Sequence, residues 1–307
     1  MTIAHDHHCG GGIHSHAPTG KMGTAFFITL AVLLVEVIGG KISNSLALLA
    51  DAGHVFTDLA AIGLSWYALK QAQKPPSEKM TYGYQRTGIL AALFNAASLL
   101  VIAVIICWEA YGRFFSPEEV KSTSMLIVAS VWFLANLYVV LGMRHEKDLN
   151  VRSAFLHMAG DAAASAGVIL GGIIIAFTGW YIIDPILSIA ISLLIAAGAW
   201  RLLRETVSIL MEGAPADVDF EKAVGSILST EGVRELHDLH IWSITKGNSA
   251  LSCHVVVDGS LTVDKGQEIL RGIEHKLLHL GIGHVTVQFE DGNHPHKNQI
   301  LCAVRQS

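Results

Sequence analysis

Six long apolar stretches, separated by short polar segments, occupy the first two thirds of the chain. They cover residues 22–40, 45–69, 87–111, 122–143, 153–178 and 182–203. Each is close to the roughly 20 residues that an α-helix needs to cross the hydrocarbon core of a bilayer. The pattern predicts a polytopic α-helical membrane protein with six transmembrane helices, formed by residues 22–211.

The pattern changes after residue 212, where charged residues return and apolar positions become periodic. Asp219 is placed to cap a helix, and the turn 246–248 separates two alternating segments typical of strands. The expected elements are a helix over 220–229, strands over 233–245 and 249–258, a helix over 264–280 and a strand over 284–290. This order predicts a C-terminal α/β ferredoxin-like domain over residues 212–291, on the cytoplasmic face.

Composition agrees with a membrane protein. Of the 307 residues, 51% are hydrophobic and 15% are charged, and the mean hydropathy is +0.47. Soluble domains carry about 25% charged residues. The net charge of -5 excludes a broadly basic nucleic-acid binder. The four cysteines form no C-x-x-C pair and indicate no disulfide framework.

The connections after the first, third and fifth apolar stretches lie on one side of the membrane, and those after the second and fourth lie on the other. Basic residues are distributed unevenly between these two sets of connections. The first set holds only Lys41, Arg113 and Lys121. The second set, with the end of the sixth stretch, holds Lys70, Lys74, Lys79, Arg86, Arg144, Lys147, Arg152, Arg201 and Arg204. Because cytoplasmic loops carry the excess of Lys and Arg, both termini are expected in the cytoplasm.

The two ends of the chain, residues 1–21 and 292–307, are expected to be disordered. The N-terminal segment is rich in glycine and in possible metal ligands: His5, His7, His8, Cys9, His14 and His16. An N-terminal histidine cluster can be a cloning artefact, but the irregular spacing here favours a native tail that collects metal weakly. His294 and His296 are incidental or weak ligands in the second tail.

Two histidine–aspartate pairs stand inside apolar stretches. His54 and Asp58 are four residues apart in the second stretch, and His157 and Asp161 are four apart in the fifth. This spacing puts each pair on one helix face. Ionisable side chains at membrane depth are costly and mark functional sites. One pair is equally well explained as polar packing between helices, but two matched pairs supply the ligands of a four-coordinate zinc site.

The two histidine–aspartate pairs also indicate how protons and zinc would compete for one site. Two aspartates neutralise the charge of Zn²⁺, and an imidazole binds metal only when deprotonated, so that protons compete with the ion. Because histidine titrates near neutral pH, a modest proton gradient would load and empty such a site. The two nitrogen and two oxygen ligands favour zinc over cadmium, manganese and magnesium.

Other polar residues in the apolar stretches receive different interpretations. Asp51 lies one turn before His54 and either orients it or lines the entry path. Asp184, directly before a proline, fits a helix start. Glycine pairs at 39–40 and 171–172 allow close helix packing. Interhelical hydrogen bonding or cavity lining is expected of Glu36, Asn95 and Asn136.

These features together resemble the cation diffusion facilitator family, and in particular its bacterial zinc-exporting branch, which is similar to the vesicular zinc transporters. The resemblance rests on the six stretches, both H-x-x-x-D pairs, the segment 45–54 and the segment His-Asp-Leu-His-Ile-Trp at 237–242. It implies a homodimeric zinc/proton antiporter of the cell inner membrane, which exports cytoplasmic Zn²⁺ by alternating access. It also implies that His54, Asp58, His157 and Asp161 form the transport site.

The same resemblance implies a second, regulatory zinc site in the cytoplasmic domain, with His237, His254 and Glu290 as ligands. His240 is a weaker candidate because it lies three residues from His237, on the opposite side of a regular strand unless a bulge intervenes. His284 is likewise weaker. Some members of this family have an additional metal site, which uses a histidine in the loop corresponding to residues 70–86. None occurs there, so that additional site is expected to be absent.

Two other classes of protein fit the sequence less well. An intramembrane metalloprotease would need a glutamate base beside its ligands and an open metal position, and neither histidine–aspartate pair offers the glutamate. A membrane-anchored metal sensor would use the C-terminal domain but would leave the intramembrane ligands unexplained. The protein is therefore expected not to be an enzyme.

Overall fold

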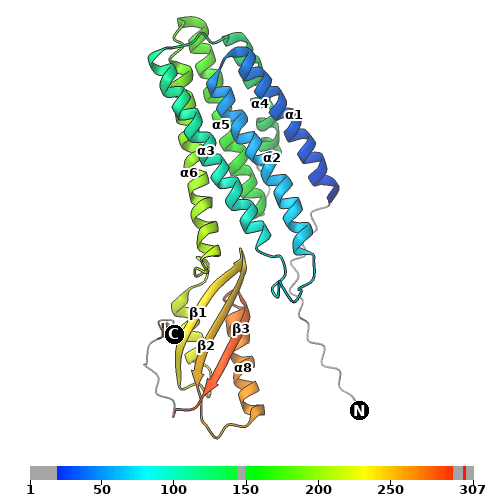
Figure 1. The fold of residues 1–307 in the computed structure, drawn as a ribbon, viewed down its shortest axis with the longest axis vertical. Coiled ribbons are helices and arrows are strands. Elements are labelled where there is room, and N and C mark those ends of the chain that lie inside the picture. The colour runs from blue at the N-terminus through cyan, green and yellow to red at the C-terminus, as the bar shows by residue number, and fades with distance from the viewer. Residues whose placement is uncertain (1–18, 144–148, 293–299, 302–307) are drawn as a thin grey trace. The chain divides into compact units, whose positions relative to one another are not determined.

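The computed structural model describes residues 19–143, 149–292 and 300–301 (Figure 1). Each predicted apolar stretch corresponds to one long helix, to within one residue at its start. These helices are α1 (Thr19–Ser43), α2 (Leu46–Ala72), α3 (Thr87–Phe115), α4 (Ser122–Met143), α5 (Leu149–Thr178) and α6 (Ile183–Leu210). The terminal segments 1–18, 293–299 and 302–307, which include the N-terminal histidines and His294 and His296, lie outside the described residues.

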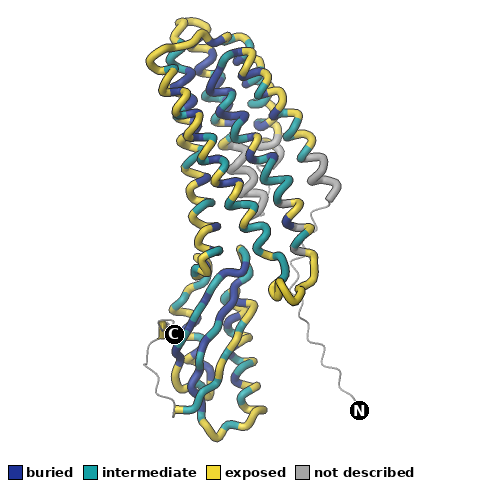
Figure 2. Tube along the Cα trace, in the orientation of Figure 1, coloured by how far each residue is buried: buried dark blue, intermediate teal, exposed yellow. Residues whose placement is uncertain are grey.

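The helices have the length and surface of membrane spans. Five of those described are long and apolar enough to cross a bilayer, and α4 adds a shorter apolar stretch, Ser122–Tyr138. Large apolar side chains of these helices are exposed, including Trp108 at 80% and Phe177 at 86%. Exposed positions recur along the helices (Figure 2). So much exposed apolar surface indicates contact with lipid rather than water.

The chain divides into two compact units, residues 1–66 with 105–192 and residues 67–104 with 193–307. In the first unit α4 packs along α5 and α1, and glycines allow this close approach. A Cβ atom on Gly39 would lie 2.5 Å from Val128 Cγ2, and one on Gly172 would lie 2.9 Å from Leu126 Cδ2. One on Gly171 would lie 2.1 Å from Leu187 Cδ1 of α6. The expectation of close packing at the glycine pairs is confirmed.

Asp184 connects the beginning of α6 to the beginning of α2. Its carboxylate accepts hydrogen bonds from Ser45 Oγ at 2.5 Å, Leu46 N at 2.7 Å and Ala47 N at 3.3 Å. The residue is fully buried. Asp184 does stand at a helix start, as expected, but its side chain caps a different helix, because the first N–H groups of α2 have no acceptor within their own helix.

The connection between α1 and α2 is a tight turn. Asn44 adopts a φ of 56°, the left-handed conformation common after the last turn of a helix. Its backbone carbonyl accepts from Arg113 Nη1 at 2.9 Å, and its side-chain Nδ2 donates to Glu118 Oε2 at 2.8 Å. Lys121 N donates to Ser43 O at 2.8 Å. The end of α1 is therefore tied to the segment between α3 and α4.

The C-terminal domain, which belongs to the second unit, has the predicted element order. It contains α7 (Phe220–Leu228), β1 (Glu235–Thr245), β2 (Asn248–Val256), α8 (Val263–Leu278) and β3 (Ile282–Glu290). The sheet order is β1-β2-β3, with β1 antiparallel and β3 parallel to β2. Both helices cover one face of the sheet, where Ile227, Leu251 and Ile273 are fully buried. This arrangement, with two helices on one face of a small sheet, agrees with the predicted α/β ferredoxin-like domain.

Asp219 is the N-cap of α7, as predicted. Its carboxylate accepts from the backbone N–H of Lys222 at 3.1 Å. This backbone hydrogen bond, supported by the Lys222 side chain, lowers the pKa of Asp219 below its ordinary value.

The cap provided by Asp184 generates a stability prediction. Replacing Asp184 with alanine leaves the first donors of α2 without an acceptor in a buried position, at a cost of about 2 kcal/mol or more. Asp219→Ala is the matched control, since it removes an exposed N-cap worth about 1 kcal/mol. Thermal unfolding of the detergent-solubilised protein should show a larger drop in Tm for Asp184→Ala. An equal or smaller drop would contradict the role assigned to Asp184.

Candidate metal centres

The first candidate centre lies between α2 and α5. His54 Nε2 is 3.3 Å from Asp161 Oδ1 and 3.7 Å from Asp58 Oδ2. One ligand atom from each of these residues can be chosen so that all lie within 4.8 Å of one another. Two ligands of a tetrahedral zinc ion are about 3.3 Å apart, so this spacing matches a metal site. The side chain of the fourth predicted ligand, His157, lies outside the described residues.

Helix geometry accounts for the placement of the first three residues. His54 and Asp58 stand one turn apart on α2, and Asp161 enters from α5, so that residues 107 apart in sequence meet. The side chains are 20%, 32% and 13% exposed for His54, Asp58 and Asp161. Partial exposure suits a site that an ion must enter and leave.

Two buried carboxylates adjoin this centre. Glu36 of α1 and Asp51 of α2 are 1% and 3% exposed, and their side chains lie close enough to interact with each other. Asp51 also lies within the electrostatic reach of His54, which is compatible with the orienting position expected of it. Asn136 is fully buried, but its amide makes no hydrogen bond to a described residue. Of the two roles expected of Asn136, interhelical hydrogen bonding is not seen among the described residues, and cavity lining stays a prediction.

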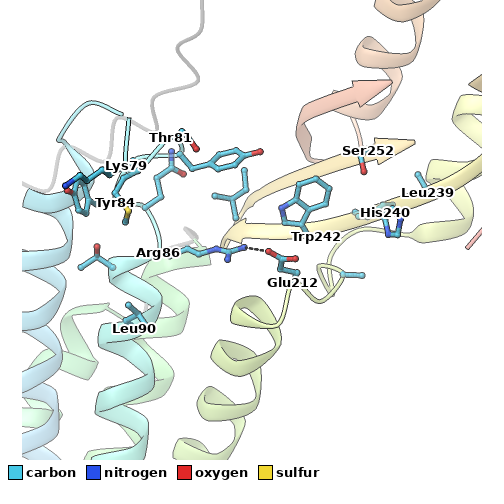
Figure 3. Close-up of a pocket in the computed structure, with 18 of the residues that line it drawn as sticks. Lys79, Thr81, Tyr84, Arg86, Leu90, Glu212, Leu239, His240, Trp242 and Ser252 are labelled. Carbon is cyan, nitrogen blue, oxygen red and sulfur yellow. Dashed lines mark ion pairs between the residues drawn. The ribbon is translucent and has the colours of Figure 1, made fainter. Parts of the chain in front are cut away.

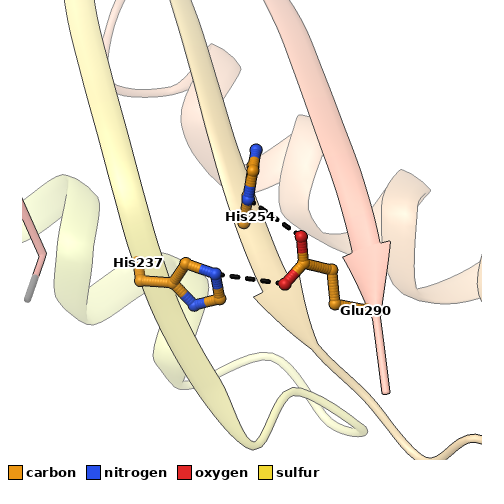
Figure 4. Close-up of side chains that lie close together, drawn as sticks. All are labelled: His237, His254 and Glu290. Carbon is orange, nitrogen blue, oxygen red and sulfur yellow. Dashed lines mark ion pairs between the residues drawn. The ribbon is translucent and has the colours of Figure 1, made fainter. Parts of the chain in front are cut away.

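The second candidate centre lies on the sheet of the C-terminal domain (Figure 4). His237 Nε2 is 3.2 Å from Glu290 Oε2, and His254 Nδ1 is 3.0 Å from Glu290 Oε1. The side chains of His237 and Glu290 are only 4% and 7% exposed. Two imidazole nitrogens and a carboxylate at these separations fit the donor set of a zinc ion.

Strand register brings these three residues together. His237 on β1 is directly opposite His254 on β2, and Glu290 is beside Val256, two residues further along β2. Side chains two apart in a strand share a face. All three therefore project from the face of the sheet opposite the helices, one from each strand.

The other two histidines proposed for this domain are placed differently. A bulge follows His237, since His240 is opposite Ser252 while His237 is opposite His254. Asp238 within the bulge has a φ of 51°, a left-handed conformation uncommon for aspartate. The bulge returns His240 to the face of His237, but its Nε2 lies 3.2 Å from Asp238 Oδ1. His284 is exposed near the start of β3, six residues from Glu290.

A cavity in the second unit contains His240 (Figure 3). Its volume is about 880 Å³, and its lining includes Trp242 and the segment 79–87. Arg86 Nη2 lies 3.8 Å from Glu212 Oε1 and donates to Ser243 O at 3.4 Å. His240 lines this cavity, and it is not among the described residues whose ligand atoms cluster with those of His237, His254 and Glu290.

Cys253 precedes His254 but is not a ligand. It is 2% exposed and belongs to the core between the sheet and the helices. Burial raises the pKa of its thiol to about 12. Metals bind the thiolate, so a protonated thiol on the core face takes no part in the centre.

Two segments of the chain match domains of known protein families. Residues 23–211 match the cation efflux transmembrane domain, and residues 215–292 match the cytoplasmic domain of cation efflux proteins. The chain belongs to the cation efflux family. The resemblance to the cation diffusion facilitators is confirmed, and so is the architecture of several membrane helices followed by a cytoplasmic domain. Because members of this family are transporters, this cation efflux protein is not an enzyme, and the metalloprotease alternative is excluded.

The relatives are bacterial metal transporters of similar length. The chain is 42% identical to a "Cadmium, cobalt and zinc/H(+)-K(+) antiporter" of Bacillus subtilis, over 91% of each chain. It is 39% identical to "Zinc transporter ZitB" of Escherichia coli, over 90% of this chain and 92% of the relative. A solved metal-bound C-terminal domain of the CzcD transporter from Cupriavidus metallidurans is 40% identical, covers 24% of this chain and 99% of its own, and has a TM-score of 0.22.

Proposed function

We propose that this cation efflux protein exports Zn²⁺ from the cytoplasm in exchange for protons, by alternating access. The observation that carries the proposal is the meeting of His54, Asp58 and Asp161 between two membrane helices. With His157 they form the proposed transport site of two imidazoles and two carboxylates. Relatives named as zinc transporters and as a zinc/H(+)-K(+) antiporter support both the ion and the exchange.

The proposed ligand set explains the coupling without a separate proton path. Asp58 and Asp161 balance the charge of Zn²⁺, which lowers the cost of holding the ion at membrane depth. Protonation of His54 removes its metal-binding lone pair and adds a repulsive charge. A site that opens to the more acidic side therefore releases zinc and takes up protons, and one that opens to the cytoplasm does the reverse.

The proposed setting is the cytoplasmic (inner) membrane, with both termini in the cytoplasm. The excess of Lys and Arg in the connections that follow α2 and α4 supports this orientation. We also propose a homodimer. Support comes from the cytoplasmic domain, residues 215–292, whose family model carries a dimerisation name.

The proposed regulatory site holds zinc through His237, His254 and Glu290. The support for it is the donor set, since two imidazole nitrogens and a carboxylate lie close together on one face of the sheet, as a zinc ion requires. Because metal stabilises whichever arrangement binds it better, zinc here would favour one arrangement of the cytoplasmic domains and so adjust transport.

The transport site is tested by flux. Asp58→Ala or Asp161→Ala removes a carboxylate that neutralises the ion, so zinc uptake into proteoliposomes with a pH gradient should fall to the level of protein-free liposomes. Phe56→Ala is the matched control, because Phe56 is on the same helix and is 50% exposed. It should transport normally. Near-normal flux in either aspartate variant, with the protein folded, would refute the assignment.

The regulatory site is tested in the same assay. His237→Ala removes one ligand of the sheet group and should slow zinc transport several-fold without abolishing it. His284→Ala removes an exposed histidine of the same domain and should have no effect. If flux in folded His237→Ala protein vanished altogether, the sheet group would belong to the obligatory path of the ion.

Selectivity follows from the proposed donor set. Zinc readily binds two nitrogen and two oxygen ligands in a tetrahedral arrangement, at distances of about 2.0–2.2 Å. Cadmium is larger and requires the helices to spread, while manganese and magnesium prefer more oxygen ligands. Some relatives carry cadmium and cobalt in their names and others only zinc, so the preference needs direct measurement.

His54→Asp replaces a nitrogen ligand with a charged oxygen and relaxes the site, so cadmium transport should rise relative to zinc. The measurement compares zinc and cadmium uptake into pH-jumped proteoliposomes for the wild-type protein and the variant. Equal rates for the two ions in the wild-type protein would show that the ligand set does not set selectivity.

A further inference from the structure

A pair of histidines on α8 lies outside both centres described above. His275 and His279 are four residues apart near the end of the helix, and both are exposed. Their ring centroids are 4.7 Å apart, with the ring planes at 81°. The two imidazoles therefore already lie side by side, one helical turn apart, where one ion can reach both.

The pair faces away from the core of the domain. Ile273 and Leu277, which precede the two histidines by two residues each, are fully buried against the sheet. Two residues in an α-helix correspond to a rotation of about 200°, so His275 and His279 occupy the opposite face. His237, His254 and Glu290 project from the other side of the sheet. The pair is thus separated from that group by the core.

The local field favours a cation at this position. His279 is the C-cap of α8 and His275 is in its last turn, where the helix dipole is negative. The nearby positive charge of Lys276 is directed elsewhere, since its Nζ donates to Ser229 Oγ at 3.0 Å and Thr230 Oγ1 at 3.1 Å. Arg271 and Glu274, both exposed, carry opposite charges one turn earlier and next to His275.

We propose that His275 and His279 chelate one divalent transition-metal ion of the class that prefers imidazole, namely Cu²⁺, Ni²⁺ or Zn²⁺. Water completes the coordination, because the pair supplies two nitrogens and no carboxylate. Affinity follows the general order in which Cu²⁺ exceeds Ni²⁺ and Zn²⁺. This site differs from the sheet group in its ligands and does not depend on the proposed transport function.

Chelation has a local structural consequence. An ion bound to both rings links residues in successive turns, so it stabilises the end of α8 against opening. A single imidazole cannot do this, because it binds the ion without joining two turns. Loss of either histidine should therefore remove the effect completely.

Hydrogen exchange of the full-length protein in detergent tests the proposal, with Ni²⁺ as the probe. Exchange is followed by mass spectrometry on peptides covering residues 271–280. Metal bound elsewhere, including at the N-terminal histidines, is read in other peptides. At free Ni²⁺ ten times the dissociation constant, exchange at the end of α8 should slow by about tenfold.

Three variants complete the experiment, each compared with itself in the absence of metal. Ni²⁺ should not slow exchange at the end of α8 in His275→Gln or in His279→Gln. It should slow exchange as in the wild-type protein in His284→Gln, which removes an exposed histidine from β3. The proposal is overturned if millimolar Ni²⁺ has no effect on the wild-type peptide, or if the effect persists in His279→Gln.

Discussion

The first backbone N–H groups of a helix need acceptors, and a bilayer does not supply them. In this protein the need is met at α2 by a side chain from another helix, since Asp184 accepts from Ser45, Leu46 and Ala47. The cap fixes the beginning of α2 against the beginning of α6. His54 follows Leu46 by eight residues, or about 12 Å along the helix axis. The cap therefore fixes the end of α2 from which the position of the first candidate centre is measured.

The second ligand helix, α5, is placed by contacts of a different kind. Gly171 and Gly172 admit Leu187 of α6 and Leu126 of α4 to distances that a larger residue would not permit. In lipid the association of helices rests on packing and on polar contacts rather than on burial from water. Asp161 lies about three turns earlier on the same helix. In a bundle with this cap on α2 and these glycine contacts on α5, Asp161 Oδ1 lies 3.3 Å from His54 Nε2.

The sequence predicts the local features of this structure but not the contacts between residues that are far apart in the chain. Helices, strands and the i, i+4 pairs are local properties, so periodicity predicted them, and Asp219 was identified as an N-cap because cap and helix are adjacent. For Asp184 the sequence predicts only a helix start, because its partners lie 137 to 139 residues away and no local pattern encodes that distance. The sequence does not predict the bulge at Asp238, although it allows one. Strand alternation assumes a regular ladder, whereas a single inserted residue reverses the faces that follow it.

The two candidate centres differ in how their ligands are held, and this difference fits different tasks. His237, His254 and Glu290 come from three hydrogen-bonded strands whose register fixes all of their spacings. A change at that centre requires the sheet to slip or the domain to open, which suits a site that retains metal and reports its presence. His54, Asp58 and Asp161 come from two helices, and no backbone hydrogen bond joins these helices among the described residues, so small shifts alter the ligand distances. A cargo ion must be released in every cycle, so the ligands of a transport site have to separate without unfolding anything, and helices in lipid can do so.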